Sequence, residues 1–404
     1  MIAGKKILLC VSGGIAVYKA CILTSKLVQA GAEVKVIMTD SAMEFVSPLT
    51  FQALSRNDVF FDTFDEKNSK VIAHIDLADW ADIVIVAPAT ANTIGKLANG
   101  IADDMLTTTL LATTANVWIA PAMNVHMYDH PAVKKNIRTL FDYGYQFIEP
   151  SEGYLACGYV GKGRLEEPEK IVALLNRHFE KLDLGMPLKN VKILITAGPT
   201  REKIDPVRYF TNHSSGKMGY AIAEVAEMLG ANVTLITGPT NLVPPENVTT
   251  IQIESAKEMY ESVMAYFPHT DVVIKSAAVA DYRPRYTYDQ KLKKQQDNLE
   301  VEMERTTDIL KELGKQKQHQ LLVGFAAETS NIEEYAKKKL ETKNLDLIVA
   351  NNVTAKGAGF GTDTNIVTIF ERNLGKLELP LMSKHDVAKK LLEKIDMLLR
   401  EQVR

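Results

Sequence analysis

The sequence contains little cysteine, little tryptophan and no excess of basic residues. Its 404 residues include three cysteines and two tryptophans, and the formal net charge is −3. Cys10, Cys21 and Cys157 form no CxxC pair, which argues against a zinc site and is typical of a reducing cytoplasm. Cys10 and Cys21 fall in an expected strand and an expected helix, so we predict that both are inert. The charge balance argues against a general nucleic-acid binder, which carries a basic face.

Long apolar segments are also missing. No run of about 18 uninterrupted apolar residues occurs, so the sequence predicts no membrane span and a cytoplasmic location. The apolar run before Cys10 is shorter than the roughly 7–15 residues of a signal-peptide core, and we interpret it as a buried strand. With 46% hydrophobic residues, the chain is long enough for two domains with full cores.

Two segments have the strand–loop–helix pattern that binds phosphate. Near the N-terminus, a predicted strand over 6–11 is followed by a glycine turn and a helix over 15–29. In the middle, a strand over 191–195 leads through a long polar loop, which ends in residues 212–216, to a helix beginning near Lys217. The free N–H groups and the dipole of a helix N-terminus favour an anion. The sequence therefore predicts two anion sites, about one domain length apart.

Strands and helices alternate through both halves of the chain. Such alternation predicts the α/β class, here two doubly wound Rossmann-like domains. We expect domain one over residues 1–183, a linker over 184–189 and domain two over 190–404. Further strands are predicted over 33–38, 83–86, 117–120, 233–236, 272–275, 321–325 and 347–350.

Small and polar residues follow the predicted strands of domain one, at the edge where open α/β sheets bind ligands. Gly13 and Gly14 match neither GxGxxG nor a Walker A loop, and they could equally serve tight strand–helix packing. Asp40 could bind a ribose hydroxyl, whereas Thr39 and Ser41 suit a phosphate.

Three further residues of domain one are candidates for chemistry. His74 precedes a predicted helix and could be a cap or a catalytic base. Asn124 follows a strand, either as a ligand or as a turn residue. Cys157 lies within the glycine-rich residues 152–164, which are typical of a mobile flap that could place the thiol over a site.

Domain two has a similar ligand edge and two basic clusters. Asp281 follows the strand over 272–275 and could bind a metal or a ribose. Residues 283–294 are basic and aromatic, which fits either a solvated loop or a cluster for a triphosphate. Lys339 and Lys343 are spaced i, i+4 and should share one helix face.

These motifs resemble those of known families. Domain one is similar to the flavin-dependent cysteine decarboxylases, which have a flavodoxin-like fold, in Gly13-Gly14-Ile15-Ala16, His74, Pro121-Ala122-Met123-Asn124 and Cys157. Domain two is similar to phosphopantothenoylcysteine synthetases. Over essentially its full length, the chain resembles the bifunctional coenzyme A biosynthesis family of bacteria.

The first resemblance implies an FMN-dependent decarboxylase acting on 4'-phosphopantothenoylcysteine. FMN oxidises the thiol side of the substrate to a thioaldehyde, loss of CO2 then gives an enethiol, and hydride and a proton return. The implied acid is Cys157, His74 assists near the flavin, and Asn124 holds the substrate's amide or carboxylate. The implied FMN-binding residues are Gly13, Gly14, Ile15, Thr39, Thr90 and Asn92.

The second resemblance implies a ligase that joins 4'-phosphopantothenate to L-cysteine through an acyl-cytidylate. CTP and Mg²⁺ are the implied nucleotide and metal, Asn212 stabilises breakdown of the intermediate, and Lys291 is catalytic. Thr306-Thr307 departs from the family's usual Asn-Pro before Asp308. The family forms homo-oligomers. The implied nucleotide-binding residues, with Asp281 also the metal ligand, are Lys275, Ser276, Ala277, Asp281, Lys291, Thr307, Asp308, Ile309, Leu310, Phe325, Lys339 and Lys343.

Two other functions fit the composition. One is a nicotinamide-dependent oxidoreductase with a fused regulatory domain, against which the missing GxGxxG counts. The other is a non-catalytic flavoprotein that binds a partner, against which Asn212 and the matching lysines count.

Overall fold

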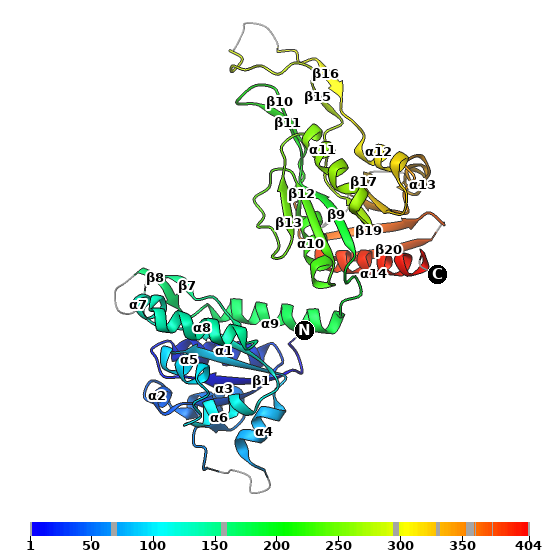
Figure 1. Ribbon diagram of the computed structural model, residues 1–404. Coiled ribbons are helices and arrows are strands. Elements are labelled where there is room, and N and C mark those ends of the chain that lie inside the picture. The colour runs from blue at the N-terminus through cyan, green and yellow to red at the C-terminus, as the bar shows by residue number, and fades with distance from the viewer. Residues whose placement is uncertain are drawn as a thin grey trace. The chain divides into compact units, whose positions relative to one another are not determined.

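The chain divides into two compact units, Met1–Asp183 (unit 1) and Leu184–Arg404 (unit 2). The computed structural model describes residues 2–65, 71–154, 160–293, 299–328, 332–352, 359, 361–373 and 375–402 (Figure 1). Within these residues, no helix has both the length and the apolar character that a bilayer crossing requires.

Unit 1 is a parallel sheet with helices on both faces. The strand order is β3-β2-β1-β4-β5-β6, so the order reverses between β1 and β4. The strands are β1 (Lys6–Val11), β2 (Glu33–Met38), β3 (Val59–Phe60), β4 (Ile83–Ala89), β5 (Asn116–Pro121) and β6 (Gln146–Phe147). The helices are α1 (Val17–Gln29), α2 (Asp40–Met43), α3 (Pro48–Ser55), α4 (Ala73–Trp80), α5 (Ala91–Ala98), α6 (Met105–Ala112), α7 (Val125–Asp129), α8 (Pro131–Asp142) and α9 (Pro168–Leu184).

Alternate residues of the central strands fill two cores. Ile7, Leu9 and Val11 of β1 pack with apolar residues of α1 and α9 on one face. Leu8 and Cys10 pack with α4, α5 and α6 on the other face. A strand buried on both faces reads as a continuous apolar run, which is why the sequence predicted β1 and β2 to the residue.

Unit 2 has the same arrangement on a longer sheet. The strand order is β13-β12-β9-β14-β17-β18-β19-β20, and the last two strands are antiparallel to their neighbours. The strands of this sheet are β9 (Lys192–Ala197), β12 (Asn232–Thr237), β13 (Thr249–Gln252), β14 (Val272–Lys275), β17 (Leu321–Glu328), β18 (Leu347–Asn352), β19 (Thr364–Glu371) and β20 (Lys376–Ser383). Its helices are α10 (Lys217–Met228), α11 (Ala256–Tyr266), the 3-10 turn η1 (Phe267–His269), α12 (Ile309–Gln316), α13 (Ile332–Thr342) and α14 (Lys384–Gln402). The predicted doubly wound α/β class is confirmed for both units.

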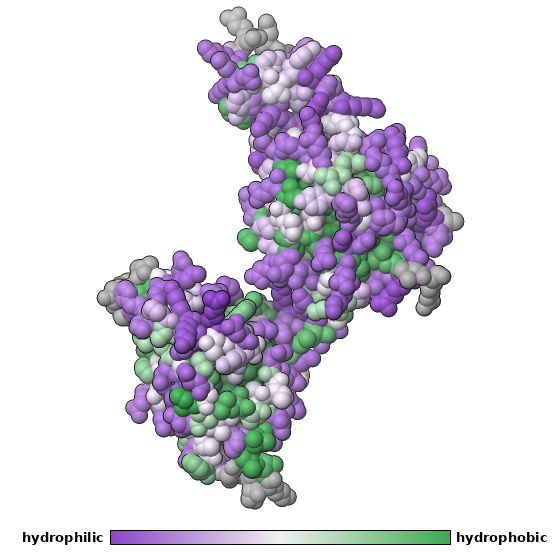
Figure 2. Space-filling view, viewed as in Figure 1, coloured by the Kyte–Doolittle hydropathy of each residue, from purple (hydrophilic) through white to green (hydrophobic). Residues whose placement is uncertain are grey.

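Two short ladders project from the end of unit 2's sheet, and we call them the hairpin extension. One pairs β10 (Arg201–Lys203) with β11 (Tyr209–Thr211), and the other pairs β15 (Tyr282–Pro284) with β16 (Met303–Arg305). Residues 285–293 continue from β15 and belong to the same extension (Figure 1). The surface of the extension is largely polar in Figure 2.

The structure corrects several local predictions. The long polar loop expected before α10 contains the β10–β11 hairpin. On either side of residues 155–159, which lie outside the described residues, the expected flap contains an antiparallel pair, β7 (Ser151–Tyr154) with β8 (Val160–Arg164). His74 lies in the first turn of α4 and not before a helix, α1 begins at Val17 and not at 15, and β19–β20 was missed. Antiparallel hairpins escaped because their strands are short or partly exposed, so no continuous apolar run marks them.

Candidate functional sites

The first candidate site is a cavity of about 410 Å³ at the point where unit 1's strand order reverses. Such a switch point is where ligands of doubly wound sheets bind. Residues following β1, β4 and β5 line it together with β8, and they include Gly13, Gly14, Ile15, Thr90 and Asn124. The structure therefore brings together five of the residues implied for FMN or substrate. Gly13, Gly14 and Ile15 follow β1, Thr90 follows β4, and Asn124 follows β5.

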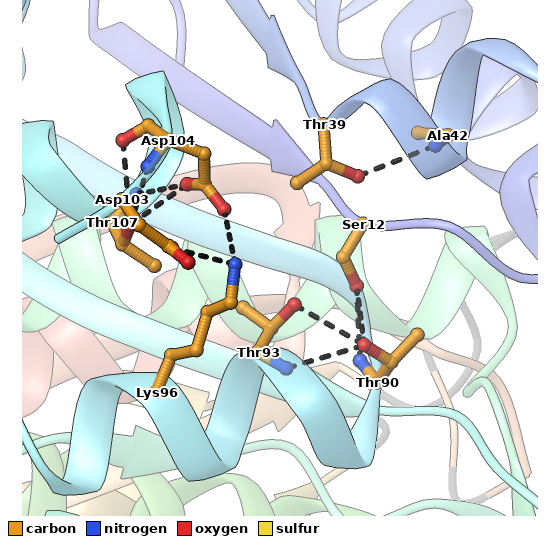
Figure 3. A network of polar contacts seen from close by, with 9 residues as sticks. All are labelled: Ser12, Thr39, Ala42, Thr90, Thr93, Lys96, Asp103, Asp104 and Thr107. Atoms are coloured by element: carbon orange, nitrogen blue, oxygen red, sulfur yellow. Dashed lines mark hydrogen bonds and ion pairs between the residues drawn. The ribbon is translucent and has the colours of Figure 1, made fainter. Parts of the chain in front are cut away.

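Hydroxyl groups connect the ends of β1 and β4 beside this cavity (Figure 3). Ser12 Oγ donates to the Pro88 carbonyl oxygen at 2.7 Å and accepts from the Thr90 backbone N–H at 3.0 Å. Thr90 in turn caps α5, because its Oγ1 accepts from the Thr93 N–H. The network holds the two strand ends in register and places Thr90 at the cavity wall.

Gly13 and Gly14 serve different purposes. A Cβ on Gly13 would lie 2.3 Å from Ser41 Cβ and 2.5 Å from the Ser41 backbone, so this glycine permits close packing. A Cβ on Gly14 would meet only Thr90 Cγ2, at 3.8 Å. The packing interpretation therefore holds for Gly13, whereas Gly14 leaves open space beside the cavity.

Thr39, Asn92 and His74 do not line this cavity. Thr39 caps the short α2, and its Oγ1 accepts from the Ala42 N–H at 3.3 Å. Asn92 is exposed in the first turn of α5. His74 is half-buried, and its buried Nδ1 has no hydrogen-bond partner within the described residues. Within the described part of unit 1, the buried His74 Nδ1 therefore has no partner, and His74 is not among the residues that line the cavity.

The family resemblance implies that Asn124 holds the substrate and that Cys157 is the acid. Asn124 lines the cavity and also caps α7, since its Oδ1 accepts from the His126 N–H at 2.8 Å, so the turn interpretation and the ligand position coexist. Cys157 lies outside the described residues. The hairpin flanking it is anchored at the cavity, because the Met123 N–H donates to the Gly163 carbonyl oxygen at 2.9 Å.

Burial separates the other two cysteines from reactivity. Cys10 is fully buried in β1, and burial followed by the charge of Asp104 raises the pKa of its thiol. Burial also raises the pKa of the half-buried Cys21. A thiol with a raised pKa stays protonated and unreactive at neutral pH, in agreement with the predicted inert role.

Lys19 is a cavity residue that the sequence reasoning missed. Its side chain is 4% exposed, and its ammonium group donates to the Leu165 carbonyl oxygen at 2.8 Å and to Glu167 Oε1 at 3.0 Å. The available signal was a lysine on the apolar stripe of α1, one turn before Leu23. A lysine in such a place needs a polar partner.

The cluster of Lys96 with Asp103 and Asp104, in contrast, is structural (Figure 3). Asp104 forms a capping box with Thr107 at the start of α6. The bond to Asp103 is the main cause that raises the pKa of Lys96. None of these residues lines the cavity.

The second candidate site is a cavity of about 170 Å³ at the switch point of unit 2, between β9 and β14. Its walls are the N-terminus of α10, the residues following β14 and the side chains of Lys217 and Lys384. Gly216 has φ = +78°, and a Cβ there would lie 2.8 Å from Thr240 Cγ2. Gly219 packs against Ala197 and Ser276, which lets α10 approach the sheet. The predicted strand–loop–helix arrangement therefore exists, with a cavity at the N-terminus of its helix.

Two ammonium groups make this cavity positive. Lys384 is 5% exposed and donates to the carbonyl oxygens of Gly359 and Thr362. Burial lowers its pKa first, and the nearby charge of Lys217 lowers it further. Lys217 donates to Asp363 Oδ1 at 2.7 Å. Two like charges beside a helix N-terminus would be stabilised by an anion. Lys217, Lys384, Asn351 and Asn365 are cavity residues that the sequence reasoning did not single out.

The residues implied for CTP fall into three groups. Ser276, Ala277 and Phe325 line this cavity. Lys275, Asp308, Lys339 and Lys343 form a second cluster, in which Lys343 Nζ lies 2.8 Å from Asp308 Oδ2. Lys275 shares a sheet face with Val273, opposite that of Ile274, so the cluster lies on the α12 and α13 side. Lys291 belongs to the third group, in the hairpin extension.

The second cluster changes the charge state of Lys275. Burial, followed by the charge of Lys343, lowers the pKa of Lys275 to about 8. For Asp308, burial acts to raise the pKa, but the bonds to Lys343 and the Lys311 N–H outweigh it and lower the pKa. Asp308 also caps α12, so it keeps this role without the family's usual preceding Asn-Pro. Thr307 precedes it, while Ile309 and Leu310 are buried in the core below.

Asn212 and Asp281 lie near the same sheet edge. Asn212 follows β11, and its Nδ2 donates to the Ala278 carbonyl oxygen at 3.0 Å. Asp281 is exposed, and its carbonyl oxygen accepts from the Thr306 N–H. Within the described residues, no three His, Cys, Asp or Glu side chains come together as a metal site.

The basic segment 283–294 is partly neutralised by acidic neighbours. Arg283 pairs with Glu304 at 2.7 Å, and Arg285 pairs with Glu302 at 2.5 Å. These exposed pairs cross the β15–β16 ladder and act as local supports. The solvated-loop interpretation therefore applies to the two arginines.

Two family models match the chain, one in each unit. The model described as Flavoprotein matches residues 1–180, and the model described as DNA/pantothenate metabolism flavoprotein C-terminal domain matches residues 188–398. Among solved structures, the C-terminal domain of a coenzyme A biosynthesis bifunctional protein CoaBC is 53% identical, with a TM-score of 0.47, over 54% of this chain and 100% of that chain.

Two full-length relatives are described as coenzyme A biosynthesis bifunctional protein CoaBC. The one from Bacillus subtilis (strain 168) is 65% identical over 402 residues, covering 99% of both chains. The one from Escherichia coli (strain K12) is 44% identical over 398 residues, covering 98% of this chain and 97% of the relative. Since relatives of this identity are matched over nearly the whole chain, and therefore over both units, the chain belongs to the family of bifunctional coenzyme A biosynthesis proteins.

Proposed function

We propose that the two units catalyse consecutive reactions. Unit 2 uses CTP to join 4'-phosphopantothenate to L-cysteine, and unit 1 uses FMN to decarboxylate the product to 4'-phosphopantetheine. The observation that carries the proposal is a cavity at each switch point of one chain, within a family of bifunctional enzymes. Membership of this family favours the enzyme over a nicotinamide-dependent oxidoreductase or a non-catalytic flavoprotein.

In unit 2, the N-terminus of α10 with Lys217 and Lys384 binds phosphate oxygens of the nucleotide. The cavity has about 170 Å³, so it accommodates the phosphate end and not the whole nucleotide. Attack by the substrate carboxylate on the α-phosphate releases pyrophosphate, and the negative charge that develops is stabilised by these cations. Asn212, at the edge of the same sheet, stabilises the acyl-cytidylate while the amine of cysteine displaces CMP. The choice of CTP rests on the resemblance.

Mg²⁺ completes the ligase proposal. Asp281 would supply one carboxylate to Mg²⁺, and triphosphate oxygens and water would supply its other ligands, because Mg²⁺ is commonly held by one or two carboxylates plus substrate phosphates. Lys275, Lys339 and Lys343 contribute positive charge from the α12–α13 side of the sheet.

In unit 1, the residues around the first cavity fit an FMN. Gly14 leaves room at the N-terminal end of α1, Thr90 presents a hydroxyl, and Ile15 and Met123 supply apolar walls. Bound FMN supplies a two-electron acceptor for the thiol carbon of the substrate. Asn124 orients the substrate's amide or carboxylate, and Cys157, which lies between β7 and β8 in the sequence, returns the proton. His74 acts as base or orienting group.

The proposal includes a homo-oligomer. Three large apolar side chains at the start of α1 are exposed. Ile15, just before the helix, is 62% exposed, and Tyr18 and Ile22 within it are 51% and 43% exposed. Clusters of this kind on a surface mark protein contacts.

One assay with a matched pair of variants tests both activities. Protein is given 4'-phosphopantothenate, cysteine, CTP and Mg²⁺, and pyrophosphate and 4'-phosphopantetheine are measured. We expect Cys157→Ser to release pyrophosphate normally while forming 4'-phosphopantetheine about 10²- to 10⁴-fold more slowly, because the proton donor is lost. Cys21→Ser, the control, retains both activities.

Two outcomes would contradict the proposal. Wild-type protein that releases no pyrophosphate with CTP removes the ligase assignment. Equal 4'-phosphopantetheine formation by wild type and Cys157→Ser removes the acid role of Cys157.

A further inference from the structure

Asp205 has a buried carboxylate in the hairpin extension, most of whose residues are exposed or half-buried. The side chain is 0% exposed, and its Oδ1 accepts from the backbone N–H groups of Val207 and Arg208, each at 2.8 Å. Oδ2 accepts from Nε and Nη2 of Arg208 at 2.9 and 2.5 Å. The guanidinium of Arg208, followed by these backbone donors, holds the pKa of Asp205 well below its usual range.

The same carboxylate reaches a distant segment. Oδ2 accepts from the Leu292 N–H at 3.1 Å, and Arg208 Nη2 donates to the Leu292 carbonyl oxygen at 3.0 Å. The Tyr288 N–H donates to the Ile204 carbonyl oxygen at 3.0 Å. Leu292, which is next to Lys291, is thus held through both its N–H and its carbonyl group by the Asp205–Arg208 ion pair.

The other end of this connection lies at the sheet edge. β11 follows the Asp205 turn and leads directly to Asn212, whose side chain bonds Ala278. Thr211 Oγ1 donates to the Thr200 carbonyl oxygen at 2.7 Å. One continuous hairpin therefore joins the Asn212 position to the segment that carries Lys291.

A purely structural role would require less than this. The turn over 204–208 is closed by bonds within itself, such as the Ile204 N–H to the Arg208 carbonyl oxygen at 2.9 Å. The bonds to Leu292 lie outside that turn and tie a distant segment to it. They also help to satisfy a buried carboxylate, which would be unfavourable without hydrogen-bond partners.

We propose that Asp205 is a positioning residue for the ligase reaction, acting through Leu292 on Lys291. This inference rests on the proposed function of unit 2. Asp205 and Arg208 keep the Lys291 segment fixed relative to Asn212, so that the Lys291 ammonium group reaches the nucleotide phosphates in a defined place.

The test is a double-mutant cycle on pyrophosphate release from CTP and 4'-phosphopantothenate. Asp205→Asn keeps the Oδ1 acceptor, but its amide NH2 cannot accept from Leu292 or Arg208. We expect kcat to fall about tenfold to a hundredfold with the KM for CTP little changed, because a small misplacement of a reacting group is enough for such a loss. Lys291→Gln should also lower kcat, and the double variant should be no slower than Lys291→Gln alone.

Lys203→Gln is the matched control. It removes an exposed ion pair with Glu254 from the same hairpin, and it keeps the backbone contact to Thr287. Its kcat should equal that of wild type. Hydrogen exchange should show faster exchange of the Leu292 amide in Asp205→Asn and not in Lys203→Gln.

The outcomes separate the inference from the proposed function. Wild-type protein without CTP-dependent pyrophosphate release contradicts the function. Normal release by Asp205→Asn, or additive losses in the double variant, overturns the positioning role while leaving the function intact. If Asp205→Asn does not fold, Arg208→Lys takes its place in the cycle, because a lysine cannot hold both Asp205 and the Leu292 carbonyl oxygen.

Discussion

At the scale of single residues, lysines that lie in helices or directly after them have different roles because their surroundings in the fold differ. Lys19 and Lys384 are buried and bonded to carbonyl oxygens, whereas Lys337 is exposed and pairs with Glu333 on its own helix. Lys339 and Lys343 are half-buried, in agreement with the predicted shared face. Burial is decided by the packing of distant strands, so the sequence indicates a lysine's position on a helix but not its environment.

The lowered pKa of Lys275 predicts how the stability of the fold depends on pH. Its pKa is about 8 in the folded chain and about 10.4 when unfolded, so between these values the unfolded state binds more protons. Stability should therefore rise with pH through this window. Below pH 8 the lysine is charged in both states, and its burial opposes folding.

The measurement is urea unfolding of wild type and Lys275→Met at pH 7 and pH 9.5. We expect the wild type to gain on the order of 1–3 kcal/mol relative to the variant between these pH values. A constant difference between the two proteins would show that Lys275 keeps its ordinary pKa.

At the scale of elements, the two cavities depend on how hairpins and loops attach to the sheets. β7 and β8 flank the Cys157 segment, and their attachment to the cavity is made at Gly163. Gly163 has φ = +140°, and a Cβ there would lie 2.3 Å from the Met123 carbonyl oxygen. Sequence reasoning recognised the glycine-rich segment. The contact that requires this glycine, however, is with Met123, which follows β5 and lies forty residues earlier in the chain.

Gly163→Ala should detach the hairpin from the cavity. We expect 4'-phosphopantetheine formation to fall at least about tenfold, because the acid would be misplaced, while pyrophosphate release by unit 2 stays unchanged. Both activities and the visible spectrum of bound flavin are measured.

Gly153→Ala is the comparison variant. Gly153 also has a positive φ of +159°, but a Cβ there meets only the flexible Arg164 side chain, at 3.5 Å. If Gly153→Ala loses as much activity as Gly163→Ala, backbone strain and not the contact with Met123 explains the loss.

At the scale of the whole molecule, the two units follow the same plan on one chain. The predicted linker over 184–189 contains residues that belong to folded structure. α9 continues through Leu184, and Leu188 is fully buried in the core of unit 2, where its N–H donates to the Leu229 carbonyl oxygen at 3.1 Å. The ligase unit therefore begins before the strand that the sequence marks most clearly.

Fragments test this boundary. Residues 184–404 should fold alone and be more stable than residues 190–404 by about 2–5 kcal/mol, because the shorter fragment leaves the Leu188 site empty. Chemical denaturation of both fragments measures the difference. Equal stability would place the boundary at 190, and Leu188→Ala in the longer fragment should reproduce most of the loss.

The sequence by itself determined the α/β class, the central strands and the two strand–loop–helix sites, because strands buried on both faces and glycine turns are local patterns. It also indicated Gly14, Thr90, Asn124 and Ser276 as residues of the ligand edge, since each lies close to the carboxyl end of a strand, and all four line a cavity. Only the tertiary structure decided that Lys19, Lys217 and Lys384 line these cavities, that Gly13 packs on Ser41, and that Asp205 holds Leu292. These depend on contacts between segments far apart in the chain, where burial and charge are set by neighbours that no local pattern records.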